Sequence, residues 1–287
     1  MRGSPLIIIL ASVLSLSACS LRTVATRATA GILDRGSSVF YEEPDPALAR
    51  DAMPGQLKLV EALLKNDPRN AELLKTLSEG FTGYAFLFVE DEAPERAGRL
   101  YDRAAGYAAS LLAVDGIPDV ERMSPEALEG VLKKAGTAAV PGLYWTAYAW
   151  ALQANLSPND PEALSRIGKA ERMMRRVLEL DPGFKFGGPD LFFGVYYSVR
   201  PRMAGGDLDK AKAHFEAAVA RTGGRYLMAR TLYAKYYAVA ALDEALFRSL
   251  NEGVLSSNSD EPRGAVLENQ VAQLKSKRLL EKIDDLF

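Results

Sequence analysis

Residues 170–182 read Ala-Glu-Arg-Met-Met-Arg-Arg-Val-Leu-Glu-Leu-Asp-Pro, and this stretch decides the fold. Its apolar positions Ala170, Met174 and Val177 recur at spacings of four and three residues, which places them on one face of an α-helix. The stretch ends in Leu180-Asp181-Pro182, and a proline after the last turn prevents the helix from continuing. A small residue beside large ones on one face predicts a helix that packs closely against a neighbour.

The same arrangement recurs on both sides of this stretch. It is found at Ala97, Tyr101 and Ala104, at Ala211, Phe215 and Ala218, and in degenerate form at Ala245. A first helix with small and aromatic residues precedes each copy. Its positions are Leu74, Leu77 and Phe81; Ala147 and Trp150; Gly194 and Tyr197; and Leu232, Tyr233 and Tyr236. Helix pairs of this composition are typical of tetratricopeptide repeats.

The spacing of the copies shows that the repeats have diverged. The interval from Ala211 to Ala245 is 34 residues, the standard period, whereas Ala170 to Ala211 spans 41 and Ala97 to Ala170 spans 73. No alternating strand pattern persists along the chain. We therefore predict an all-α fold, a divergent tetratricopeptide-like array of antiparallel helix pairs over residues 44–287. A helical bundle without repeats remains the alternative.

Two further helices are expected outside the repeats. Ser124-Pro125-Glu126 should open one of them, because serine caps a helix N-terminus well and proline suits the first turn. The other should run from about Gly264 to Lys282 and bury Val271, Leu274, Leu279 and Ile283. Such a helix would cover the last apolar face of the array.

The first residues predict export. Arg2 precedes an apolar run from Pro5 to Leu16, which has signal-peptide length and is too short to span a bilayer as a helix. The run leads into Leu16-Ser17-Ala18-Cys19, which resembles the bacterial lipobox, where the chain is cut before a cysteine that receives a diacylglyceryl group. We expect residues 1–18 to be a signal peptide, Cys19 to be lipidated and residues 19–43 to form a tether. An ordinary signal peptide with a chance cysteine is the alternative.

This reading of the N-terminus predicts a location. Several acyl chains on one residue would anchor the protein stably to a membrane. Ser20 follows the cysteine, which in the sorting rule of enteric bacteria favours the outer membrane of a Gram-negative cell. The protein should therefore face the periplasm. Cys19 is the single cysteine of the chain, so no disulfide can form within the domain.

Composition and motifs argue against several functions. A net charge of −2 without a concentrated basic face excludes nucleic acid as a partner. His214 is the single histidine, so zinc ligation by the usual nitrogen and sulfur donors is not expected, and no serine lies in a nucleophile-elbow motif. The pairs Gly187-Gly188, Gly205-Gly206 and Gly223-Gly224 lack a phosphate-loop context and should turn the chain between helices. We predict no enzyme activity, no cofactor and no metal.

Arginines and aromatic residues gather on predicted helices. Arg172, Arg175 and Arg176 lie at helical spacing beside Glu171 and Glu179, which favours an exposed face with ion pairs over a docking patch. The aromatic residues should mostly be core.

The inward positions of the first helices could also line a groove. Register places Tyr144, Tyr148, Arg230 and Tyr237 near those positions, and aromatic rings with polar tips are a common lining of ligand and peptide grooves. These four residues are the predicted ligand- or partner-binding site.

The second half of the chain resembles the T-component family of tripartite ATP-independent periplasmic (TRAP) transporters. The resemblance rests on Phe186-Gly187-Gly188-Pro189 followed by Phe193-Gly194-Val195, on Arg200-Pro201 with Gly205-Gly206 and the helix Ala211 to Ala218, on Gly223 to Ala229 continuing to Tyr233-Ala234-Lys235-Tyr236-Tyr237-Ala238, and on Leu267 to Ala272 near the end. The lipobox and the helix end at Asn66-Asp67-Pro68 also fit the family. One departure is Ala245-Leu246-Phe247-Arg248, where the family often carries a histidine, so no role of that histidine transfers.

The resemblance implies a periplasmic helical lipoprotein that associates with the substrate-binding protein of a TRAP transporter. It also implies a small hydrophobic or carboxylate ligand, and it leaves a homotrimer open as the assembly state. A general envelope assembly scaffold of the tetratricopeptide type, not tied to a transporter, is the alternative function.

Overall fold

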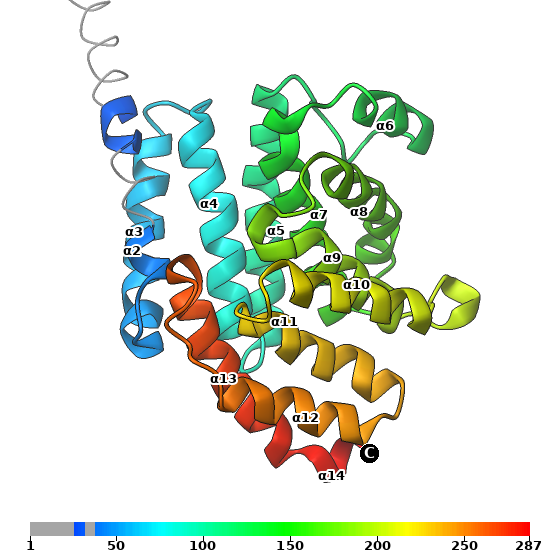
Figure 1. Cartoon of the computed structure of the whole chain (residues 1–287). Coiled ribbons are helices and arrows are strands. Elements are labelled where there is room, and N and C mark those ends of the chain that lie inside the picture. Colours follow the sequence, from blue (N-terminus) through cyan, green and yellow to red (C-terminus); the bar gives the residue numbers. More distant parts are fainter. Residues whose placement is uncertain (1–25, 32–37) are drawn as a thin grey trace, which may run out of the picture.

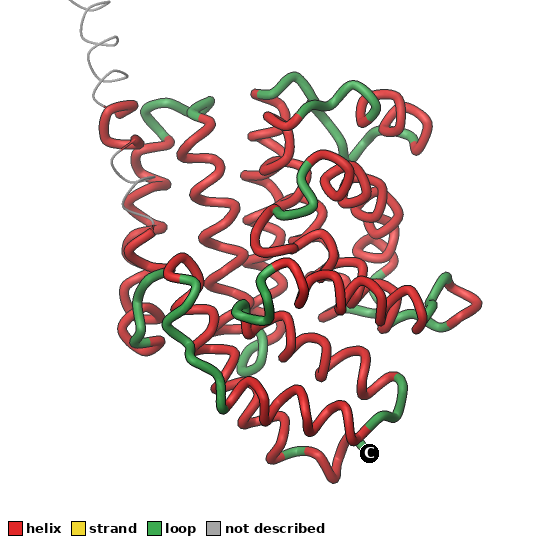
Figure 2. Tube along the Cα trace, in the orientation of Figure 1, coloured by secondary structure: helices red, strands yellow, loops and turns green. Residues whose placement is uncertain are grey.

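A computed structural model describes residues 26–31 and 38–287. This part of the chain consists of helices joined by turns and loops and contains no strand (Figure 2). The main helices are α2 (Ser38–Tyr41), α3 (Pro46–Leu64), α4 (Ala71–Tyr84), α5 (Pro94–Val114), α6 (Pro125–Leu132), α7 (Val140–Leu156), α8 (Pro161–Leu180), α9 (Phe184–Ser198), α10 (Leu208–Arg221), α11 (Leu227–Leu232), α12 (Glu244–Leu255), α13 (Val266–Glu281) and α14 (Ile283–Leu286). Two π-helical segments, η1 (Ala85–Val89) and η4 (Tyr233–Ala238), extend α4 and α11. Short 3₁₀ segments are η2 (Thr137–Ala139), η3 (Arg202–Ala204) and η5 (Arg263–Ala265).

Consecutive helices form four packed pairs, as the repeat pattern predicts. The pairs are α4 with α5, α7 with α8, α9 with α10, and α11 with α12. Figure 1 shows the pairs stacked in chain order, with the helix axes turning between α8 and α12. The predicted all-α array of helix pairs is confirmed.

Small residues let these helices approach closely, and large ones fill the space between them. Ala170, Met174 and Val177 of the opening stretch are fully buried, and the corresponding positions of α5 and α10 are buried as well. In the third pair the first helix contributes a glycine, since a Cβ atom on Gly194 would lie 2.8 Å from the Phe215 ring. The small-against-large pattern in the sequence is therefore the packing pattern of the structure.

Local capping fixes where several helices begin. The carboxylate of Asp45 accepts hydrogen bonds from the first turn of α3, and Asp160, Asp207 and Asp243 do the same for α8, α10 and α12. Ser124 accepts from the Ala127 amide at 3.2 Å, so α6 begins where the sequence predicts. Each cap satisfies an amide that has no partner within its helix.

Two details of the predicted register are wrong. Ala245 is exposed, and the buried face of α12 is formed by Phe247, Asn251 and Val254. These residues match Ala211, Phe215 and Ala218 at an interval of 36 residues, because the π-helical η4 and its turn take up more residues than the standard repeat. Leu274 is 48% exposed, although Val271 and Ile283 are buried as expected.

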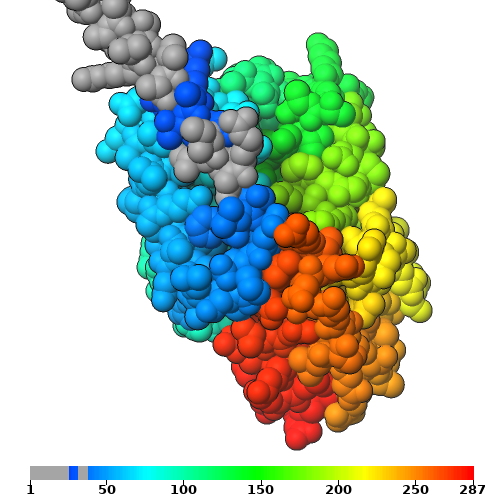
Figure 3. Space-filling model, turned by 60° about the vertical axis from the view of Figure 1, so that its left-hand side comes forward, coloured from blue at the N-terminus to red at the C-terminus, as the bar shows by residue number. Residues whose placement is uncertain are grey.

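The last long helix closes the array. It is α13, close to the predicted range, and it packs against α11 and α12 and also against α2 and α3 from the beginning of the domain. Figure 3 shows the N-terminal and C-terminal segments side by side on one face. We call the contact of α13 with α2 and α3 the seam. The ammonium group of Lys275, also on α13, is nearly buried and pairs with Asp91 at 2.5 Å.

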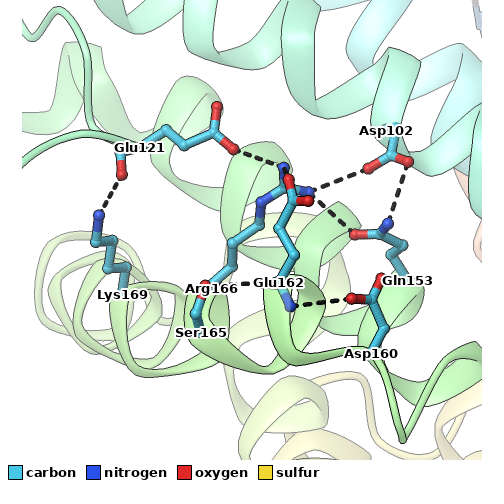
Figure 4. Close-up of polar contacts among 8 residues, drawn as sticks. All are labelled: Asp102, Glu121, Gln153, Asp160, Glu162, Ser165, Arg166 and Lys169. Atoms are coloured by element: carbon cyan, nitrogen blue, oxygen red, sulfur yellow. Dashed lines mark hydrogen bonds and ion pairs between the residues drawn. The ribbon is translucent and has the colours of Figure 1, made fainter.

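Arg166 ties three parts of the array together on another face. Its guanidinium contacts Asp102 on α5 at 3.2 Å, Gln153 on α7 at 3.2 Å and Glu121 in the segment between α5 and α6 at 2.6 Å (Figure 4). Its side chain is 16% exposed, and Glu162 contacts it from the preceding turn of α8. A partly desolvated network of this kind orients helices more than isolated surface pairs do. The arginine group on the outer face of α8 also forms ion pairs as expected, Arg175 with Glu171 and Arg176 with Glu179.

The predicted signal peptide, Cys19 and most of the predicted tether lie outside the described residues. In the part that is described, no helix is both long and apolar enough to cross a bilayer.

Candidate functional site

An apolar cavity lies where the second, third and fourth helix pairs meet η1. It has a volume of about 40 Å³, and we call it the inner cavity. Five aromatic side chains line it: Phe86, Tyr148, Phe192, Tyr196 and Tyr236. Aliphatic side chains from α7, α8, α9 and α11 complete its wall. An apolar space of this size holds little more than a water-sized group at rest.

A wider pocket of about 590 Å³ adjoins the inner cavity, and we call it the outer pocket. The two share six residues in their walls: Leu152, Asn155, Ile167, Val199, Arg200 and Tyr236. Glu90 and Asp91 also line the outer pocket. Leu164 and Val199, which also line the outer pocket, are 50% and 45% exposed. The arrangement is a funnel that is open to solvent at the wide end and apolar at the narrow end, which suits a ligand with an apolar body.

Both π-helical segments border this funnel. Phe86 of η1 and Tyr236 of η4 project into the inner cavity from opposite ends of the array. π-helical turns are uncommon and often mark functional positions, because the wider turn redirects side chains that an α-helix would point elsewhere. Here both segments aim an aromatic ring into one space.

Arg200 stands where the inner cavity meets the outer pocket. Its guanidinium carbon lies 3.6 Å from the centre of the Tyr196 ring, in cation–π contact. Its Nη1 atom is buried and, among the described residues, receives no hydrogen-bond partner. Burial lowers the pKa of Arg200, because removal from water disfavours the charged form. Glu171 is the carboxylate that acts on Arg200, and it is itself paired with Arg175, so the Arg200 guanidinium keeps a buried donor that can take an anionic group.

A second mouth of the funnel is rich in charge. Phe86 and Leu232 separate the inner cavity from a pocket of about 420 Å³, in which Lys235 lies 3.7 Å from Glu90 and 3.9 Å from Asp91. Glu90 also accepts a hydrogen bond from the Tyr101 hydroxyl at 2.5 Å. Burial would raise the pKa of Asp91, but Lys275 and Lys235 outweigh it, so the pKa is lowered. The ammonium groups of Lys235 and Lys275 are thus already paired, in contrast to Arg200.

The four predicted site residues do not form one groove. Tyr148 lines the inner cavity. Tyr144 is buried and stacks on Tyr148, with ring centroids 5.4 Å apart. Arg230 packs at the Gly224 turn and donates to the Ser257 hydroxyl at 3.3 Å, and Tyr237 tilts against Tyr233. Neither Arg230 nor Tyr237 lines the cavity.

Arg200 is the residue that our sequence reasoning missed. The signal was present, because Arg200 follows Tyr196 by four residues at the end of an aromatic helix, a spacing that sets a cation beside a ring. The pattern could not show that Arg200 shares a cavity wall with residues of α7 and η4 and keeps a buried Nη1 atom without a hydrogen-bond partner among the described residues.

The remaining sequence candidates have structural roles. His214 is half-buried, contacts Asp190 at 2.8 Å through Nδ1 and stacks on Phe193 and Tyr197. Gly205, Gly223 and Gly224 have positive φ angles between helices, as expected of turn positions, whereas the positive φ angle of Gly187 lies at a kink inside α9. Within residues 26–31 and 38–287, no three histidine, cysteine or acidic side chains converge as a metal site would require.

Comparisons with known proteins point in one direction. A family model described as TRAP transporter T-component matches residues 42–287. An uncharacterized protein of Treponema pallidum (strain Nichols) is 29% identical over 195 residues, which cover 62% of this chain. That match spans 60% of the length of the Treponema protein.

Proposed function

Because the chain belongs to the TRAP transporter T-component family, we propose that it is a lipid-anchored periplasmic accessory protein of such a transporter. In this role it binds the substrate-binding protein and holds that protein's ligand in the funnel. The family is one of transporter components, which assigns the chain to transport. We propose a binding function without catalysis. Cys19 carries the lipid that anchors the protein, and the membrane is the outer membrane. The protein assembles as a homotrimer, and analytical ultracentrifugation tests this oligomeric state.

The single observation that carries the ligand-binding part is Arg200. Its Nη1 is buried without a partner at the junction of an apolar cavity and a wider pocket. A carboxylate placed there would gain a charge-assisted hydrogen bond, while its apolar portion would lie against Leu152, Ile167 and Val199 in the wider outer pocket. The ligand class that this geometry favours is a small carboxylate with an apolar body.

Replacing Arg200 by glutamine should weaken carboxylate binding by about 10- to 100-fold, since one hydrogen bond to a charged group contributes about 1.5–3 kcal/mol. Isothermal titration calorimetry with straight-chain carboxylates of four to ten carbons is the measurement, and the alcohols of equal length are the reference probes. The variant should bind the alcohols as the unaltered protein does. Arg202→Gln, at an exposed position two residues along, serves as the matched control and should change nothing. Equal affinity for carboxylates in both variants would contradict the role of Arg200.

Crosslinking in the cell envelope should recover a TRAP-type substrate-binding protein with this chain. The expected result is one dominant periplasmic partner, identified by mass spectrometry after purification of a tagged protein. Recovery of outer-membrane assembly proteins or peptidoglycan in place of a substrate-binding protein would favour the general envelope scaffold.

Fractionation of the same cells tests the anchor, because Cys19→Ser should move the protein from the membrane fraction to the soluble fraction.

A further inference from the structure

A cluster of charged and aromatic side chains lies inside the seam, away from the funnel. It joins Tyr41 of α2, Glu79 of α4, Trp145 of α7, Lys185 at the start of α9 and Glu268 of α13. Lys185 and the Tyr41 hydroxyl both donate to Glu79 Oε1, and the Lys185 ammonium lies 4.8 Å from the centre of the Tyr41 ring and 5.8 Å from that of Trp145. The first, middle and last parts of the domain therefore meet at one polar point.

The charges of this cluster do not balance. Among the described residues, Lys185 is the cation that acts on Glu268, and it is already paired with the second carboxylate, Glu79. Lys75, one turn before Glu79 on α4, lines the same pocket as Glu79 and Lys185 but is not among the groups that act on Glu268. Although Glu268 as a whole is half-buried, its Oε2 atom is buried and has no hydrogen-bond partner among the described residues. The Trp145 Nε1 atom is also buried and has no hydrogen-bond partner among the described residues. A second negative charge here has no counter-ion and little contact with water, which makes it costly.

The backbone holds the single cation in this place under strain. Lys185 and Phe186 have φ angles of 48° and 58°, and Gly187 follows at 84°. Left-handed conformations are unfavourable for residues with a Cβ atom and persist only where the surroundings enforce them. Phe186 is fixed by stacking on Tyr226 at 4.9 Å, and Lys185 by its pairing with Glu79. The lysine is therefore committed to this site and is not free to follow a change of charge.

From this geometry we infer that the Glu79–Lys185–Glu268 cluster is a proton-operated clasp on the seam. When Glu268 carries a proton, the cluster is neutral, and α2 and α13 stay closed on the array. When Glu268 loses the proton, its charge opposes that of Glu79, and the seam loosens. Burial raises the pKa of Glu268 to about 7, with Glu79 adding to the rise and Lys185 opposing it, which puts the change near neutral pH.

The groups that surround Glu268 support this assignment. The charged ones are Lys185 from α9 and Glu79 from α4. Four tyrosines face it, and the pKa of each is raised by burial and by the nearby acid: Tyr41 from α2, Tyr144 and Tyr148 from α7, and Tyr226 before α11. These hydroxyls stay neutral throughout the range.

Three other charged groups on α13 and on helices that touch it have their own contacts. Arg230 on α11 contacts Ser257, Arg248 on α12 pairs with Glu244, and Lys275 on α13 itself pairs with Asp91. Glu268 is thus the group of this cluster whose charge changes near neutral pH.

Amide hydrogen exchange tests the clasp on the intact protein. After correction for the intrinsic exchange rate, protection of residues 38–43 and 266–276 should fall roughly five- to tenfold per pH unit between about pH 5 and pH 7 and then level off, because the opening equilibrium depends on pH only between the ordinary pKa of a glutamate in the open state and the pKa of about 7 in the closed state. Glu268→Gln should remove this fall and keep both segments protected at pH 8. Glu281→Gln, at an exposed position of the same helix, is the control and should behave like the unaltered protein.

A second variant keeps the test decisive if Glu268→Gln folds poorly. In Glu79→Gln the lysine is released to pair with Glu268, so the midpoint of the protection change should move to lower pH. Trp145 gives an independent readout, because Trp150→Phe leaves it as the single tryptophan and its fluorescence should titrate with the same midpoint. The clasp is refuted if the pH dependence of the seam survives in Glu268→Gln, or if the unaltered protein shows none between about pH 5 and pH 7.

Discussion

Replacing Gly194 by valine should lower the free energy of unfolding by about 3 kcal/mol, because added carbon atoms have no space between α9 and α10. A Cβ atom at this position would already lie 2.8 Å from the Phe215 ring. That ring is fully buried and stacks on Tyr233 with centroids 5.0 Å apart, so it cannot move aside. Urea denaturation followed by circular dichroism measures the change.

A glycine elsewhere in the array gives the matched control. Gly98 lies inside α5, and a Cβ atom there would meet nothing within 4 Å. Gly98→Ala should therefore raise the free energy of unfolding by about 0.5–1 kcal/mol, since alanine favours the helix over glycine. The two substitutions are expected to have opposite signs. A Gly194→Val protein as stable as the parent would show that close helix approach is not what holds the third pair.

Replacing Asp190 by alanine should cost about 3 kcal/mol at pH 7, because the substitution leaves Arg221 and His214 without their shared partner. The Asp190 carboxylate is nearly buried and accepts hydrogen bonds from Arg221 Nε at 2.7 Å and contacts His214 Nδ1 at 2.8 Å. These contacts join α9 to α10. Glu216→Ala, which removes an exposed carboxylate from α10, should change stability by less than about 0.5 kcal/mol.

The pH dependence of this effect has a defined sign. Burial raises the pKa of Asp190, but the hydrogen bonds from His214 and Arg221 outweigh burial and leave the pKa below its ordinary value. A carboxylate with a lowered pKa in the folded state stabilises the protein above its ordinary pKa and loses that contribution as the pH falls. The difference between the unaltered protein and Asp190→Ala should thus be full at pH 7 and shrink below about pH 4. A difference that is independent of pH would show that the ionised carboxylate is not responsible.

The fold could be predicted because its main determinant is local. Residues such as Ala170, Met174 and Val177 carry both the helical period and the small-against-large packing in a short stretch. Caps such as Ser124 are equally local, since the serine and the amide it binds are three residues apart. Helix order and pairing then follow from short connections between neighbours.

Register and site could not be predicted, because they depend on contacts between distant residues. The π-helical η4 shifts the buried face of α12 from Ala245 to Phe247, and no period of apolar residues signals that change. Tyr148, which lines the inner cavity, was among the predicted residues because it lies on a strongly aromatic helix. Arg200 was not among them, because what makes it a candidate is a buried Nη1 atom without a hydrogen-bond partner among the described residues, and that depends on all the elements around it.

The contact between the first and last helices also has a mechanical consequence. Force applied to the domain through residue 38 does not unzip the array helix by helix, because α2 is bonded to α4 through Tyr41 and Glu79 and lies against α13. The load is shared by contacts to two helices at once, so several bonds must break before α2 separates from the array. A protein held by its N-terminal segment and pulled by a docked partner would keep its repeats in order under that tension.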